Sequence, residues 1–72
     1  MKNQVTFNAE KLKEARGQRP QSAVARELGI SRQLLKYYES GGWPSVEKLV
    51  LLMSYFKLQF GELVVSNKPR ES

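Results

Sequence analysis

The segment from Arg32 to Tyr37 carries side chains whose hydrogen-bonding chemistry suits a nucleic acid. An arginine such as Arg32 can donate two hydrogen bonds to a guanine edge, and a glutamine such as Gln33 can pair with an adenine edge. Lys36 can reach a guanine or a phosphate, and Tyr37 can hydrogen-bond a phosphate or pack on a thymine methyl group. The alternative is an ordinary solvated helix face, so the surrounding elements must be considered.

Composition excludes most kinds of enzyme chemistry. The 72 residues contain no histidine, no cysteine and no aspartate, and most catalytic triads and metal sites need at least one of these types. A chain of this length forms one domain at most. We therefore expect a protein that is not an enzyme and that uses neither a metal nor a cofactor.

Hydropathy gives no sign of a membrane segment. Residues 1–19 lack the apolar run of a signal sequence, and the most apolar stretch, residues 46–58, is too short to span a bilayer and is interrupted by lysines. We expect a cytoplasmic protein that does not contact a membrane.

Positive charge is concentrated in one half of the chain. The net charge is +5, and residues 11–36 hold seven basic and two acidic side chains, so the remaining residues sum to zero. A basic surface favours a polyanion as partner, because neutralising phosphates releases condensed counterions. The alternative is that a small protein is mildly basic for solubility.

Helix start and stop signals predict an all-α fold. Asn8 and Ser31 are typical N-cap residues, and Gly17 and Gly29 are typical of helix ends. We expect helices at 8–16, 21–28 and 31–40, a fourth opened by Pro44 and Ser45, and a short helix or turn at 60–65. The domain is expected to span residues 1–66, and the polar segment 67–72 is expected to be a disordered tail.

The second and third helices are predicted to form one rigid corner. Ala25 is small where the two helices cross closely, and Gly29 can adopt the left-handed backbone of a tight turn. The inward positions are Val24, Leu28, Ile30, Leu35 and Tyr38. The positions left on the outer face are Ser31, Arg32, Gln33, Lys36 and Tyr37.

Several short motifs follow one another in an order typical of a known family. They are LKEAR at 12–16, Gln21 with Ala25, LGISR at 28–32, Glu39-x-Gly41, Pro44-Ser45 and Phe60-x-x-Leu63. With these motifs the region from about Leu12 to Leu63 resembles the Cro and phage-repressor type of helix-turn-helix protein. The resemblance implies a compact five-helix, lambda-repressor-like fold and a Cro-like transcriptional regulator that represses by binding double-stranded DNA.

The resemblance also implies roles for individual residues. The third helix would read bases in the major groove with Ser31, Arg32, Gln33, Lys36 and Tyr37. Gln21 and Ser40 would contact phosphates. Further phosphate contacts are expected from Arg16, Arg19 and Arg26, because the connection after the third helix lacks the basic residues that relatives use there. Glu39 is expected to form an ion pair with Lys13. Leu34 is expected to lie at the edge of the core. Trp43 is expected to pack under the fourth helix or to donate to a phosphate.

One recognition helix covers only a few base pairs, which favours a homodimer on a palindromic operator. The residues expected at the dimer contact are apolar where the helical pattern predicts polar ones: Leu51, Tyr55, Val64 and Val65. The alternative is that they fill a thin core. A second hypothesis for the whole chain is an antitoxin or adaptor whose helix-turn-helix domain chiefly binds a protein partner.

Overall fold

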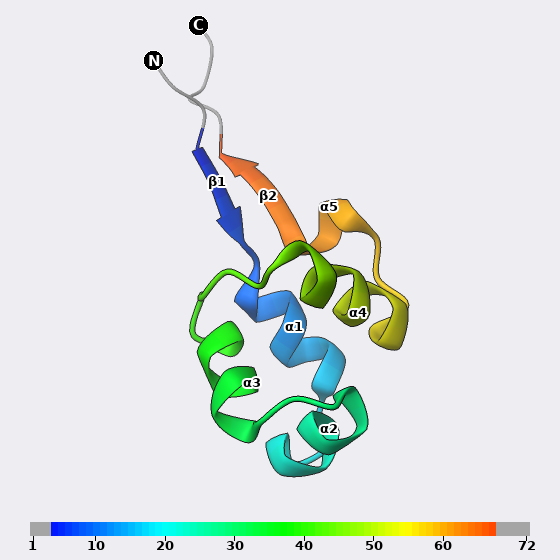
Figure 1. Cartoon of the computed structure of the whole chain (residues 1–72). Helices are drawn as coiled ribbons and strands as arrows, with labels where there is room; N and C mark the ends of the chain where they lie inside the picture. Colours follow the sequence, from blue (N-terminus) through cyan, green and yellow to red (C-terminus); the bar gives the residue numbers. More distant parts are fainter. Residues whose placement is uncertain (1–3, 68–72) are drawn as a thin grey trace, which may run out of the picture.

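The computed structural model describes residues 4–67, which form five helices and a two-stranded ribbon. The elements run β1 (Gln4–Phe7), α1 (Ala9–Arg16), α2 (Gln21–Leu28), α3 (Arg32–Glu39), α4 (Val46–Phe56), α5 (Phe60–Leu63) and β2 (Val64–Asn67). Figure 1 shows the ribbon at one end of the molecule and α2 and α3 at the other, with α1 between them. Within residues 4–67, no helix is both long and apolar enough to cross a membrane.

The helix starts predicted from capping residues are confirmed by side-chain contacts. An oxygen of each N-cap side chain accepts a hydrogen bond from the amide three residues later, at 3.2 Å for Asn8, 3.0 Å for Ser31 and 3.2 Å for Ser45. These bonds satisfy amides that the first turn of a helix leaves without a partner. At the opposite ends, α2 stops at Gly29 with φ +77° and α4 stops at Lys57 with φ +58°.

One core holds the five helices together. The five largest fully buried side chains come one from each helix: Leu12, Val24, Leu35, Leu52 and Leu63. Because every helix contributes one of them, no helix can leave without exposing apolar surface to water. The position of α3 is therefore set by the packing of the whole domain.

The fold departs from the predicted all-α class at the two ends of the described chain. β1 and β2 pair antiparallel, with Phe7 opposite Val64 and Val5 opposite Ser66. The short helix or turn predicted at 60–65 is accordingly a helix only to Leu63, where strand pairing takes over. Strands of four residues are too short for alternation to reveal them, and each becomes a strand because the other lies beside it.

The predicted boundary of the domain also shifts slightly. Asn67, expected to begin a disordered tail, pairs with Gln4 as the last residue of β2. The rest of that predicted tail, residues 68–72, lies outside the described residues. The ribbon is tied to the helices by the amide of Asn8, which donates to the carbonyl of Leu63 at 2.7 Å.

Candidate nucleic-acid interface

α2 and α3 meet at a tight corner that is closed on its inner side. The buried side chains of the corner are Val24, Ala25, Leu28, Leu35 and Tyr38. At the turn, the amide of Ile30 donates to the carbonyl of Ala25 at 3.0 Å, and Gly29 takes the left-handed backbone that costs glycine little. The inner face predicted for this motif is confirmed, and it fixes the direction in which the outer face of α3 looks.

The outer face of α3 presents hydrogen-bonding groups to solvent. The exposed residues are Ser31, Arg32, Gln33, Lys36 and Tyr37, and Leu34 is half-buried at the edge of the core as predicted. The hydrogen bonds and ion pairs within residues 4–67 leave the side chains of Arg32, Gln33 and Lys36 without a partner. Donors and acceptors held on a rigid helix are thus available to an external ligand.

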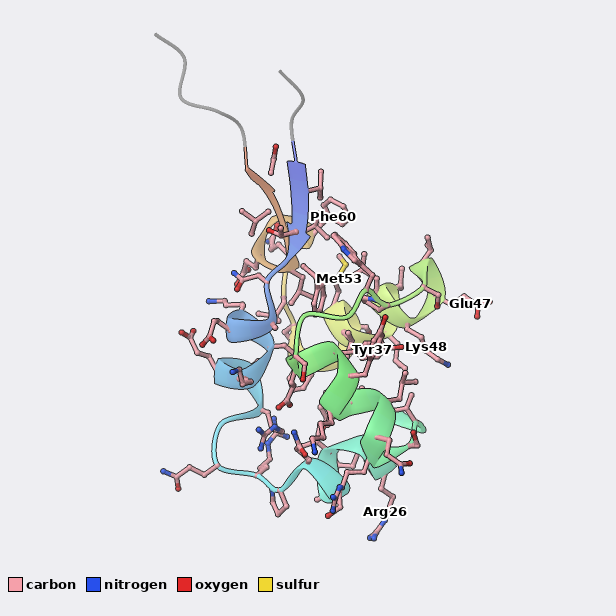
Figure 2. The ribbon with its side chains drawn as sticks, turned by 90° about the vertical axis from the view of Figure 1, so that its left-hand side faces the viewer. Arg26, Tyr37, Glu47, Lys48, Met53 and Phe60 are labelled. Carbon is pink, nitrogen blue, oxygen red and sulfur yellow. The ribbon has the colours of Figure 1, made fainter. Side chains whose placement is uncertain are left out.

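Charge at this end of the described chain is mainly positive. Arg32 and Lys36 are exposed on α3, and Arg26 is exposed on α2, where Figure 2 shows it projecting from the end of the molecule. The acidic residue of α3, Glu39, is buried, and the carboxylate of Glu27 on α2 accepts a hydrogen bond from the hydroxyl of Tyr55. Arg26, Arg32 and Lys36 form no ion pair within residues 4–67, so their charges are available to an anion that approaches α3.

Glu39 is the centre of a buried polar cluster that joins three helices. Its carboxylate accepts hydrogen bonds from Nε and Nη2 of Arg16 at 2.6 and 2.9 Å and from Nε2 of Gln21 at 2.9 Å. Burial alone would raise the pKa of Glu39, but the hydrogen bonds from Arg16 and Gln21 outweigh it and hold that pKa below its ordinary value. The hydrogen bond to Glu39 in turn raises the pKa of Arg16. Both side chains remain charged at neutral pH, so α1, α2 and α3 are clamped together.

The cluster corrects one predicted contact. Glu39 was expected to pair with Lys13, but its partner is Arg16, and Lys13 lies 3.3 Å from Glu10. The two basic residues are three positions apart on α1, so a small rotation of that helix decides which one faces α3. The predicted link between α1 and α3 is confirmed, but the residue of α1 predicted to form it was wrong. The hydrogen bond from Gln21 to Glu39 was not predicted. The position of Gln21 at the start of α2, beside the link between α1 and α3, could have indicated it.

The residues expected to touch phosphates differ in how free they are. Arg26 is exposed and makes no polar contact through its side chain within residues 4–67. Arg19 donates to the hydroxyl of Tyr55 at 3.1 Å and to two backbone carbonyls of α1. Gln21 and Arg16 bind Glu39. The hydroxyl of Ser40 donates to the carbonyl of Lys36 at 2.9 Å.

The residues expected at a dimer contact are largely used inside the domain. Leu51, Tyr55 and Val64 are half-buried and pack against the core, whereas Val65 is 38% exposed. The more exposed apolar side chains are elsewhere: Val5, Trp43, Val46, Val50 and Phe60. The apolar sequence pattern of α4 could not distinguish half-buried from exposed positions, because that distinction depends on how the ribbon and α5 pack in the domain.

Trp43 packs against the ribbon. Its ring centroid lies 5.9 Å from that of Phe7 in β1, and the residue remains 45% exposed. The observed aromatic partner of Trp43 thus belongs to strand β1, which was not predicted, and packing under α4 or donation to a phosphate stays a prediction.

A family model described as helix-turn-helix matches residues 12–63. The match includes all of α2, α3, α4 and α5 and part of α1, and its limits are those of the region marked out by the sequence motifs. Neither a search of curated proteins nor a search of solved structures found a match to the chain.

Proposed function

Since the chain belongs to the Cro and phage-repressor type of helix-turn-helix protein, a family of DNA-binding transcription regulators, we propose that it binds a specific double-stranded operator with α3 in the major groove. The observation that carries this proposal is the outer face of α3, where exposed donors without internal partners stand on a corner held rigid by its buried side. Occupation of the groove would exclude other proteins from the same site, so the chain acts as a repressor.

Base reading is assigned to the first turns of α3. Arg32 donates two hydrogen bonds to a guanine and Gln33 exchanges two with an adenine, each pair being worth about 1–3 kcal/mol of discrimination against a wrong base. Lys36, one turn later, reaches a guanine or a phosphate. Ser31 caps α3 with its oxygen, and its hydroxyl hydrogen remains free to donate to the DNA.

Phosphate contacts hold the helix in its register. Arg26 is the freest candidate, because no internal contact has to be broken. Gln21 uses one amide hydrogen for Glu39 and keeps the second for a phosphate. Arg16 and Arg19 add positive charge near the start of α2, and a contact from Ser40 requires its hydroxyl to leave the carbonyl of Lys36.

The functional unit is proposed to be a homodimer on a palindromic operator, because one eight-residue helix covers only one half-site. The self-association surface would be the exposed apolar side chains of α4 and the adjoining elements, with Val46 at 78% and Val50 at 57% exposure. We include Val65, which is 38% exposed, in this proposed surface, whereas Leu51, Tyr55 and Val64 pack against the core. Apolar exposure of this extent on a small domain is typical of an interface.

The test of base reading is selection of bound sequences from a random duplex pool with wild type, Arg32→Ala and Gln33→Ala. A palindrome should emerge, and each substitution should relax the preference at particular positions. The matched control is Gln18→Ala, an exposed glutamine outside α3, which should leave the selected sequence unchanged. Equal loss of affinity for all sequences in both α3 variants would reduce these residues to nonspecific contacts.

The test of assembly is sedimentation equilibrium of wild type and of the double variant Val46→Lys, Val50→Lys. The wild type should sediment as a dimer and the variant as a monomer with weaker operator binding, because two charges would be buried in the contact. Glu47→Lys, an exposed neighbour on α4, is the control for added charge. A wild-type monomer at high concentration, with and without DNA, would contradict the dimer.

A further inference from the structure

α3 ends in a backbone arrangement that folds the following residues back against the helix. The amide of Gly42 donates to the carbonyl of Tyr37 at 2.9 Å, and the amide of Gly41 donates to the carbonyl of Tyr38 at 3.0 Å. Gly41 itself has the positive φ of +104°. This is the Schellman pattern of helix ends, in which the side chains at the positions of Tyr37 and Gly42 normally pack on each other.

In this chain position 42 is a glycine, and the ring of Tyr37 occupies the space that a side chain at position 42 would fill. A Cβ atom on Gly42 would overlap Cε2 and Cζ of Tyr37. The φ of Gly42 is not positive, so its backbone would accept other residues. The missing side chain is therefore explained by the place of the Tyr37 ring and not by the turn itself.

The ring is held in place while its polar end stays free. Tyr37 is 55% exposed, and its ring also lies beside that of the buried Tyr38, with centroids 5.9 Å apart. Within residues 4–67 no group hydrogen-bonds the hydroxyl of Tyr37, whereas the hydroxyl of Tyr55 donates to Glu27 and accepts from Arg19. Tyr37 thus presents an oriented hydroxyl with no internal partner.

The direction of the ring separates Tyr37 from the base-reading residues. The ring of Tyr37 lies against Gly42, which the turn after α3 folds back beside the helix. Figure 2 shows Tyr37 directed toward the side of α3 where α4 lies. The first turn of a recognition helix enters the groove and its flanks meet the backbone. The connection at 40–45, SGGWPS, offers no basic side chain for that backbone.

We propose that Tyr37 is a DNA-backbone contact, its hydroxyl bound to a phosphate oxygen at the edge of the major groove, and that Gly42 is the positioning residue that leaves room for its ring. This rests on the proposed function, and it narrows the earlier alternatives for Tyr37 to phosphate. A neutral hydroxyl neutralises no phosphate charge, so the contact adds affinity without adding counterion release.

The experiment measures binding of wild type, Tyr37→Phe and Gly42→Ala to the duplex selected from a random pool and to a scrambled duplex, over a range of salt. Loss of one hydrogen bond should weaken binding about three- to tenfold, equally on both duplexes, with the same slope of log affinity against log salt. Gly42→Ala should reproduce this loss, and adding it to Tyr37→Phe should weaken binding little further. Lys36→Gln, which removes a charge, should lower the slope by about 0.9 if it meets a phosphate.

A measurement without DNA keeps the two substitutions interpretable. In the free protein the α-protons of Gly42 should show an aromatic ring shift in NMR spectra that disappears in Tyr37→Leu and persists in Tyr37→Phe. Gly61→Ala is the matched control, because a Cβ there meets no atom within 4 Å, and it should bind as wild type does.

The outcomes are distinct. Relaxed preference at one base pair in Tyr37→Phe would make Tyr37 a base reader and overturn the inference, as would unchanged affinity in Tyr37→Phe. Unchanged affinity in Gly42→Ala would remove the role of Gly42. A wild-type protein that binds neither duplex would instead refute the proposed function itself.

Discussion

Replacing Arg16 by methionine should destabilise the domain more than any exposed substitution. The side chains of Glu39 and Arg16 are only 4% and 18% exposed, and Arg16 supplies two of the three hydrogen bonds on the carboxylate. Methionine keeps much of the aliphatic volume of arginine but leaves the carboxylate buried with Gln21 alone. Removing one partner of a buried ion pair costs about 3–5 kcal/mol.

This loss is a large part of the free energy of unfolding of a domain of this size. At about 0.05–0.15 kcal/mol per residue, a chain of this length is stable by roughly 4–11 kcal/mol. Urea unfolding followed by circular dichroism should therefore show a midpoint lower by about 3–5 M in Arg16→Met, for a slope near 1 kcal/mol/M. DNA binding should fall with the folded fraction, because Glu39 ties α3 to α1, and should fall further because Arg16 also adds positive charge near the proposed phosphate contacts.

The double variant Arg16→Met, Glu39→Leu separates the ion pair from simple loss of volume. It removes the stranded carboxylate, so it should recover at least half of the stability lost in Arg16→Met. The difference between wild type and Arg16→Met should also narrow as the pH falls, because the stranded carboxyl becomes neutral. A loss below about 1 kcal/mol in Arg16→Met, or no recovery in the double variant, would refute the reasoning.

Three further predictions concern Glu39 and the ends of α2 and α4. The pKa of Glu39 is lower in the folded than in the unfolded chain. The stability that Glu39 contributes is therefore complete above its pKa in the unfolded chain and is lost as the pH falls through its pKa in the folded chain. The free energy of unfolding should decline from about pH 5 downward, and Glu39→Gln should flatten its dependence on pH in this range. Gly29→Ala should cost about 1 kcal/mol, because φ +77° strains any side chain although space is free. Lys57→Gly, at φ +58°, should raise the unfolding free energy by about 0.5–1 kcal/mol, and thermal unfolding measures both changes.

Local signals account for the parts of the fold that were predicted. Asn8, Ser31 and Ser45 cap helices through atoms three residues away, and Gly29 ends α2 through its own backbone. Such contacts depend on short stretches of sequence, so they can be recognised without knowing the rest of the chain. The corner of α2 and α3 and its outer face follow from them.

Contacts between distant segments account for the parts that were not predicted. β1 exists because β2, some sixty residues away, pairs with it, and Trp43 turns to Phe7 only because β1 is there. The choice of Arg16 over Lys13 as partner of Glu39 depends on how α1 is rotated in the core. The ring of Tyr37 over Gly42 depends on a loop that folds back. None of these can be deduced from local pattern alone.

The ribbon has a consequence for how the domain opens. Pairing of β1 with β2 closes almost the whole described chain into one loop, and closing a loop of about sixty residues costs roughly 3–4 kcal/mol in chain entropy before any contact is gained. Two strands alone are marginally stable in water, so this seam forms after the helices have packed and frays before they separate. Amide hydrogen exchange should therefore be fastest in the ribbon and slowest around the fully buried Leu35 of α3. Figure 1 shows α3 at the end of the molecule opposite the ribbon. Fraying at the ribbon therefore leaves the corner of α2 and α3 closed.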